Sequence, residues 1–154
     1  MQSLLKPFVG MVIVAGIAGV AHAQAPFAKA EDAIKYRKSV LFVMGQHFGR
    51  IGPVVKGERP YDKDEVVKNA AIAEQMSKLP FDAFIAGSDK GETGAKPEIW
   101  TEASKFKSSA EKMQQEMSKL AQAARGGDLN AIKAQFGETG KACKACHDDF
   151  RKKN

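Results

Sequence analysis

Residues 101–128, TEASKFKSSAEKMQQEMSKLAQAARGGD, carry the clearest structural pattern in the chain. Apolar side chains recur there at alternating steps of four and three residues, which places them on one face of an α-helix. These side chains are Phe106, Ala110, Met113, Met117, Leu120 and Ala124. Thr101 is expected to cap the start of this helix, and the pair Gly126-Gly127 is expected to end it.

Three other segments show the same helical period. The first helix is predicted from Ala30 to Gly49, followed by a loop rich in glycine and proline over residues 49–60. The second is predicted to start at Asp62 or Asp64 and to stop at Pro80. Asp128 is expected to cap the last. The last helix aligns Leu129, Ile132, Phe136, Cys143, His147 and Phe150.

The stretch between the second and third helices, FDAFIAGSDKGETGAKPEIW, is too rich in glycine and polar residues for a long regular element. Its apolar residues are expected to tie it to the core. They are Phe81, Phe84, Ile85, Ile99 and Trp100. No segment alternates as a β-strand does. The sequence therefore predicts an all-α fold, an antiparallel four-helix bundle with a long loop between helices 2 and 3.

The first 23 residues have the pattern of an export signal. Lys6 supplies a positive charge, Pro7 to Val20 form an uncharged apolar run, and Ala21-His22-Ala23 suits a signal peptidase. The alternative, a retained membrane anchor, would need an apolar run of ~20 residues. Cleavage after Ala23 would leave a mature domain of residues 24–154 in the periplasm, with no membrane contact.

The charge of the chain says less about function than its motifs do. The chain has 24 Lys and Arg against 18 Asp and Glu, a formal net charge of +6. The two signs are interleaved, and no basic cluster is studded with aromatic residues, so the pattern does not indicate nucleic-acid binding.

The two cysteines of the chain, Cys143 and Cys146, stand in the C-terminal stretch KACKACHDDFRKKN, and His147 follows directly. On a helix, positions i, i+3 and i+4 lie on one side, so two thiols and an imidazole would face the same neighbour. C-x-x-C-H is the attachment pattern of c-type haem, with thioethers to the cysteines and the histidine on iron. Export agrees, because exposed thiols in an oxidising compartment must be bridged, metal-bound or otherwise blocked.

Three alternatives compete for the cysteine pair. A thioredoxin-like redox pair normally starts a helix beside a βαβ unit. A zinc site is formally possible with His47 as a fourth ligand. A simple disulfide is a third alternative, although a helical i, i+3 pair meets disulfide geometry poorly.

The chain resembles cytochrome c′, the class II c-type cytochromes, in four stretches: EDAIKYRKSVLFVMGQHFGR, LPFDAF, KPEIW and CKACHDDFRKK. In class I cytochromes c the haem motif lies near the N-terminus, with a methionine ligand far downstream. Here only residues 148–154 follow the motif, and none is methionine.

The resemblance implies one covalent haem c per chain, held through Cys143 and Cys146, with His147 as the iron ligand. It also implies that Leu41 covers the opposite face, leaving a five-coordinate, high-spin iron open to NO or CO. On the residues alone, Leu41 reads as ordinary core packing. The alternative is a six-coordinate, low-spin electron carrier in which Met44 is the sixth ligand.

Four further residues receive roles from the resemblance. Arg37 would pair with a haem propionate, or else extend its charged end to solvent at the edge of the bundle. Lys38 would contact the same propionate region. Arg151 would cover the proximal face, or else compensate the helix dipole. Phe81 would pack on the haem edge, or else anchor the loop.

Two functions follow: a periplasmic binder of diatomic gases, and an electron carrier between periplasmic redox proteins. The family resemblance also implies a homodimer formed through the first two helices. An enzyme such as a peroxidase is not expected, because neither Leu41 nor Met44 offers an acid–base group.

Overall fold

The computed structural model describes residues 27–153, so the leader predicted over residues 1–23 lies outside the described part. Four long helices form the molecule: α1 (Ala30–Val55), α2 (Lys63–Met76), α4 (Ala103–Gly126) and α5 (Leu129–Phe150). A 3₁₀ turn, η1 (Phe81–Ala83), and a one-turn helix, α3 (Glu98–Thr101), interrupt the connection between α2 and α4. The predicted all-α fold is confirmed.

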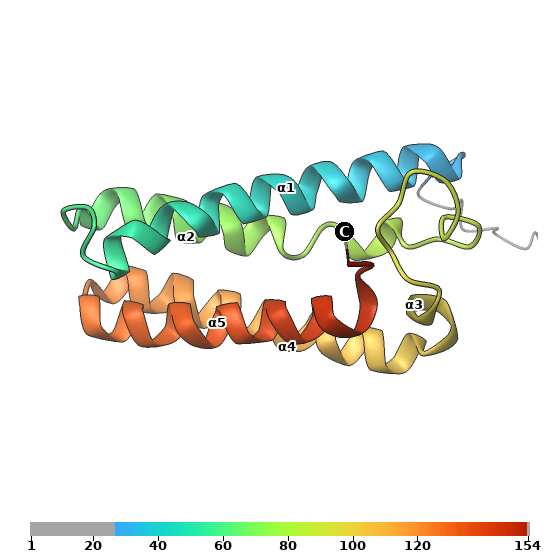
Figure 1. Ribbon diagram of the computed structural model, residues 1–154. Coiled ribbons are helices and arrows are strands. Elements are labelled where there is room, and N and C mark those ends of the chain that lie inside the picture. The colour runs from blue at the N-terminus through green and yellow to red at the C-terminus, as the bar shows by residue number, and fades with distance from the viewer. Residues whose placement is uncertain (1–26, 154) are drawn as a thin grey trace, which may run out of the picture.

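The long helices form a bundle in which each one packs against two others (Figure 1). α1 lies beside α2 and α5, and α4 lies beside α2 and α5. The long connection and α3 cover the end of the bundle at which α5 finishes. Within residues 27–153, no helix is long and apolar enough to cross a membrane.

The first helix is longer than predicted. α1 runs through Gly49, Gly52 and Pro53 to Val55, so the loop expected from residue 49 is wrong. Burial explains the difference, because Ile51 and Val54 are nearly inaccessible in the main core. Only after Val55 does the chain turn.

Capping residues fix most of the other helix ends. The Asp62 side chain accepts hydrogen bonds from the backbone N–H groups of Asp64 and Glu65, so Asp62 is the cap of α2. The Asp128 side chain accepts from Asn130 and caps α5, as predicted. Gly127, at φ +83°, ends α4 in the left-handed conformation that glycine adopts without strain.

Two predicted boundaries differ. Thr101 ends α3, and Glu102 precedes α4 without a side-chain cap, so the Thr101 cap is wrong. α2 ends at Met76, four residues before Pro80.

The core has two parts. The larger lies among the four long helices, and the regular period of α4 supplies Met113, Met117 and Leu120 to it. The smaller joins Ala95, Ile99 and Phe150 beneath the long connection, with Phe84, Trp100, Phe106 and Cys146 packed against it. The predicted apolar ties of the connection are thus confirmed for Phe81, Phe84, Ile99 and Trp100.

Candidate functional site

The last two turns of α5 carry Cys143, Cys146 and His147. The two cysteines are half-buried free thiols. Cys143 packs against the main core and Cys146 against the smaller one, so the two thiols lie at the junction of the two cores. His147 lies at the surface of the last turn, where its carbonyl accepts from the N–H of Arg151 at 3.0 Å.

The protein environment keeps both thiols neutral. Burial raises the pKa of the Cys143 thiol, and burial together with the neighbouring cysteine raises the pKa of Cys146 to about 11. Reactive dithiol motifs have lowered pKa values instead, so this site does not have the electrostatics of a thioredoxin-like pair. His147 is exposed as a residue, but neighbouring atoms partly desolvate its ring, and this desolvation, with the charge of Arg151, lowers the pKa of His147. The lower pKa favours the neutral imidazole that binds metals.

The described residues do not form a zinc site. Within residues 27–153, no group of three or more Cys, His, Asp or Glu side chains is arranged to hold a metal ion. His47 is engaged elsewhere, since its Nδ1 lies 2.8 Å from Asn69 Oδ1 between α1 and α2.

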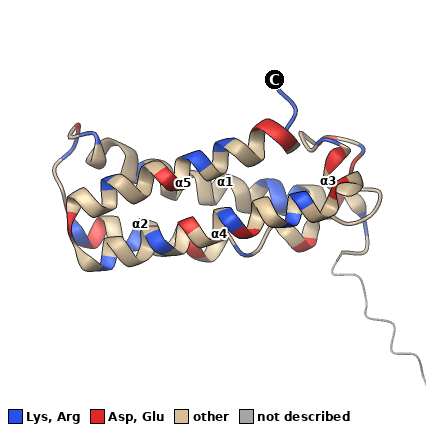
Figure 2. Cartoon of the chain, turned by 90° about the horizontal axis from the view of Figure 1, so that it is seen from below, with Lys and Arg blue, Asp and Glu red and all other residues tan. Residues whose placement is uncertain are grey.

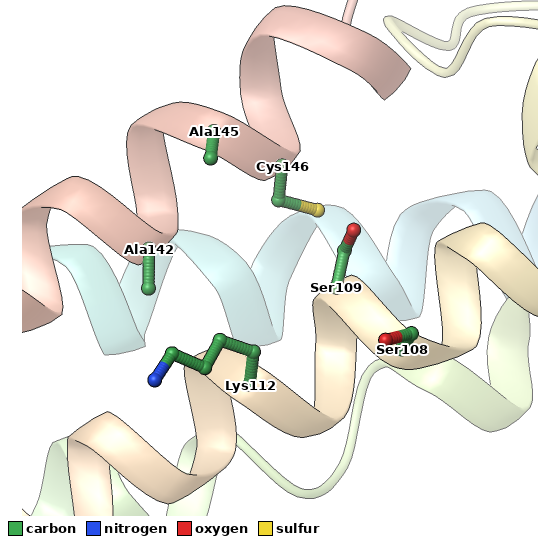
Figure 3. Close-up of a pocket in the computed structure, with 6 residues that line it drawn as sticks. All are labelled: Ser108, Ser109, Lys112, Ala142, Ala145 and Cys146. Carbon is green, nitrogen blue, oxygen red and sulfur yellow. The ribbon is translucent and has the colours of Figure 1, made fainter.

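Cys146 borders a cavity of about 220 Å³ between α4 and α5. Its sulfur points from α5 towards the Ser109 hydroxyl on α4 (Figure 3). The other lining residues are Ser108, Lys112, Ala142 and Ala145. Most of the walls are small side chains, which leave room beside the sulfur. The space is below the ~300–1,000 Å³ of most ligand pockets, so it is a gap at the thiol and not a site for a whole cofactor.

The first helix also contributes to the main core. Leu41 is half-buried and Met44 is buried, and both belong to the main core against which Cys143 packs. Phe81, in η1, packs against the same core, with its ring centroid 5.8 Å from that of Phe106. Leu41, Met44, Phe81 and Cys143 therefore all contact the main core, whereas Cys146 packs against the smaller core and His147 is exposed.

Arg37 is the most unusual residue of this region, because its guanidinium is buried with only 2% of the residue exposed. It donates to four acceptors of the long connection: Ala83 O at 3.0 Å, Ser88 Oγ at 2.7 Å, Ser88 O at 2.6 Å and Thr93 Oγ1 at 2.8 Å. It also lies 4.5 Å from the centroid of the Phe84 ring.

All four of these acceptors are uncharged, and none of the ion pairs within residues 27–153 involves Arg37. Burial lowers the pKa of Arg37 accordingly. A buried cation without a carboxylate is costly to the fold, which makes the region suited to an additional anionic group.

Lys38 and Arg151 are exposed. Lys38 Nζ donates to Glu92 O at 3.1 Å, at the edge of the same connection. Arg151 ends α5, and its backbone pairs with Ala95 in an isolated β-bridge.

These residues fit a haem. The two neutral thiols and the imidazole come from one helix, apolar side chains come from the adjoining main core, and the buried Arg37 has no carboxylate partner among residues 27–153. A profile of the family described as Cytochrome C' matches residues 32–151. The chain belongs to the cytochrome c′ family.

Relatives in the cytochrome c′ family match over almost their whole length. Cytochrome c′ of Alcaligenes xylosoxydans xylosoxydans is 48% identical over 127 residues, which is 82% of this chain and 98% of the relative. Cytochrome c′ of Rubrivivax gelatinosus is 44% identical over 128 residues, covering 82% and 99% of the two chains.

Solved cytochrome c′ structures agree in fold. A nitric oxide complex of a leucine-to-alanine variant from Alcaligenes xylosoxidans superposes with a TM-score of 0.79 at 47% identity. It covers 83% of this chain and 99% of that one. The cytochrome c′ family carries covalent haem c, and this chain contains the two cysteines that such attachment requires.

The sequence did not reveal the partners of Arg37. Ser88 and Thr93 lie more than fifty residues away from it, in a stretch that reads only as a loop. Glu116 was also missed, although its place among Met113, Met117 and Leu120 on the inward face of α4 was a visible signal.

Proposed function

We propose that this chain is an exported, periplasmic haem protein that binds a diatomic gas such as NO or CO and exchanges electrons with redox proteins. Cys143 and Cys146 would hold the haem through two thioether links, and His147 would bind its iron. Haem c supplies an iron that can take a diatomic ligand and change its oxidation state. The arrangement of both thiols and the imidazole on the last turns of α5 is the observation that carries this proposal.

Leu41 is proposed to cover the other face of the iron. A leucine has no lone pair and no hydrogen-bond donor, so it leaves iron five-coordinate and high-spin while excluding water and anions. Support comes from the relatives, because nitric oxide complexes are described for leucine-to-alanine and leucine-to-isoleucine variants of the Alcaligenes xylosoxidans protein.

The surrounding residues receive supporting roles in the proposal. Arg37 and Lys38 hold the propionate region, Phe81 packs at the edge of the cofactor, and Arg151 covers the proximal side. The uncharged partners of Arg37 favour its role, since a propionate would supply the missing negative charge.

A homodimer is part of the proposal. α1 exposes apolar side chains, with Phe42 at 66%, Val43 at 38% and Tyr36 at 37%. Large exposed apolar residues gathered on one helix are typical of an interaction surface.

An absorption spectrum of the purified ferrous protein, recorded before and after addition of CO, tests the proposal. A broad high-spin spectrum that CO shifts is the expected result. A sharp low-spin spectrum indifferent to CO would contradict it and would favour Met44 as a sixth ligand. Mass spectrometry must first show a covalent haem, since free thiols or a disulfide would overturn attachment itself.

Leu41→Ala tests the covering residue. Removing the side chain should speed CO binding to the ferrous protein. Leu120→Ala is the matched control, because Leu120 is fully buried on α4 in the main core. It should lower stability by about 2–5 kcal/mol without speeding CO binding. Equal rates for Leu41→Ala and the parent protein would remove Leu41 from this role.

A further inference from the structure

Residues 88–96 of the long connection, here named the bridging segment, contact two distant parts of the chain. At one end the segment holds α1. Arg37 Nη1 donates to Ser88 Oγ at 2.7 Å, and Arg37 Nη2 donates to Ser88 O at 2.6 Å and to Thr93 Oγ1 at 2.8 Å. Ser88 is fully buried, so water cannot readily replace these bonds.

At the other end the segment holds the last turn of α5. Ala95 forms an antiparallel bridge with Arg151. The backbone N–H of Lys96 donates to Phe150 O at 3.0 Å, and that of Lys152 donates to Gly94 O at 2.8 Å. Lys96 Nζ also donates to the carbonyls of Asp148 and Asp149, at 2.8 and 2.9 Å.

Thr93 joins the two ends. Its Oγ1 accepts from Arg37 and also from the backbone N–H of Ala95 at 3.1 Å. Ala95 is buried with Phe150 in the smaller core, against which Cys146 packs. An unbroken chain of hydrogen bonds and packing therefore runs from Arg37 on α1 to the turn of α5 that carries Cys146 and His147.

From this we infer that the bridging segment positions the two sides of the haem site relative to each other, with Ser88 and Thr93 as positioning residues. Leu41 lies one turn after Arg37 on α1, and His147 lies one turn before Arg151 on α5. The segment thus sets the spacing between the covering residue and the axial ligand. This inference rests on the haem function proposed above.

The chain offers a matched pair of serines for the test. Ser88 and Ser77 are both fully buried, and each hydroxyl donates at 2.7 Å to the carbonyl three residues earlier, Ile85 O and Glu74 O respectively. Only the Ser88 hydroxyl also accepts from Arg37. Ser88→Ala and Ser77→Ala therefore remove the same local bond, and they differ in the link to α1.

Two measurements on the haem-loaded protein report on the two ends of the bridging segment. Hydrogen exchange of peptides covering residues 94–97 and 148–153 reports the contact with α5, and the rate of CO association with ferrous protein reports the covered face. Ser88→Ala should raise exchange in both peptides about fivefold, which corresponds to roughly 1 kcal/mol at 1.4 kcal/mol per tenfold. It should also change the CO rate, whereas Ser77→Ala should leave both readouts as in the parent protein.

Thr93→Val provides a second variant of nearly the same shape. It removes the oxygen shared by Arg37 and Ala95, and it should reproduce the effects of Ser88→Ala. The inference is overturned if exchange rises only in residues 94–97, or if the two serine variants behave alike. A parent protein without covalent haem would defeat the proposed function instead, and the exchange results would still decide whether the bridging segment links α1 to α5.

Discussion

Among residues 27–153, two charged side chains are buried in the bundle, and they differ in whether an opposite charge lies beside them. Glu116 on α4, 4% exposed, lies among cations and an amide. Its carboxylate accepts from Lys112 at 2.7 Å, from Lys119 at 3.0 Å and from Gln135 Nε2 at 2.6 Å. Arg37 on α1, 2% exposed, has only uncharged acceptors among the described residues.

This difference separates a structural charge from one suited to a cofactor. Glu116 is neutralised by its own α4 neighbours and joins α4 to α5, so it needs nothing from outside the chain. Arg37 is hydrogen-bonded but not neutralised, and a buried charge of that kind is unfavourable unless an opposite charge lies near. The buried charge that lacks an opposite charge is thus the one that we propose to pair with a haem propionate. On the surface, by contrast, the two signs are interspersed along the helices (Figure 2).

Replacing Arg37 should have the largest effect. Arg37→Met removes four hydrogen bonds and leaves the carbonyls of Ala83 and Ser88 without the donor that they have in the parent protein. We expect the free energy of unfolding of the haem-loaded protein to fall by about 3 kcal/mol or more, measured by denaturant titration. If Arg37 pairs with a haem propionate as proposed, the reduction potential should also fall, because a positive charge beside the cofactor is lost.

Arg37→Lys is the matching control, since it keeps the charge but not the planar fork of donors. Relative to the parent protein, Arg37→Lys should keep a larger share of the reduction potential than of the free energy of unfolding. If Arg37→Met lowers neither quantity more than a change at Glu116 does, the contrast between the two charges is wrong.

Glu116→Gln should have a smaller, pH-dependent effect. Hydrogen bonds from Lys112, Gln135 and Lys119 hold the pKa of Glu116 at about 2, below its ordinary 4.5. The ionised form therefore stabilises the folded state above pH 4.5, and this contribution is lost as the pH falls from 4.5 to about 2. We expect the variant to be less stable by about 1–2 kcal/mol at pH 7.

Denaturant titrations from pH 7 to pH 2.5 measure this effect, and the difference from the parent protein should shrink towards the acid end. Glu138→Gln is the control on α5, because Glu138 pairs with Lys141 in an exposed ion pair that contributes little. A constant difference across the whole range would show that Glu116 acts through packing and not through its charge.

The sequence predicted the fold where local pattern and packing agree. The period of residues 106–124 and the glycine pair after it describe α4 as the structure shows it. The pattern failed at residues 49–55, where glycine and proline indicate a loop. Tertiary packing decides there, since Ile51, Val54 and Val55 are buried and Phe48 stacks on Phe136 at 4.3 Å.

Some residues of the candidate site could likewise be predicted from the sequence, and others could not. Cys143, Cys146 and His147 are close in sequence, so helical spacing alone places them together. The partners of Arg37 come from the long connection, whose path no local signal specifies. The inward position of Glu116 on α4 could be predicted from the helical period. Its hydrogen bond with Gln135 could not, because that bond depends on how α4 and α5 pack.

Thr139→Val should have a modest effect on the Glu116 side of the comparison. Thr139 is fully buried on α5, and its hydroxyl lies 3.1 Å from Glu116 O and 2.8 Å from Gln135 O. Each of those carbonyls belongs to a helix and keeps its backbone partner, so the variant leaves neither carbonyl without a hydrogen bond. We expect a loss of about 1 kcal/mol in unfolding free energy by thermal or chemical denaturation. A loss as large as that of Arg37→Met would mean that the α4–α5 contact, and not Arg37, is the more sensitive of the two.

The smallest effect is expected for the lysines around Glu116. The side chains of Lys112 and Lys119 are 61% and 55% exposed, so either cation returns readily to water when its partner is lost. Replacing one by alanine leaves the other to neutralise the carboxylate, and alanine favours the helix slightly. Each single variant should therefore shift the denaturation midpoint less than Thr139→Val does, whereas replacing both should approach the effect of Glu116→Gln. If the shift of the double variant equals the sum of the two single shifts, this prediction is wrong. Each lysine would then act independently, and the Glu116 carboxylate would not depend on having at least one cation beside it.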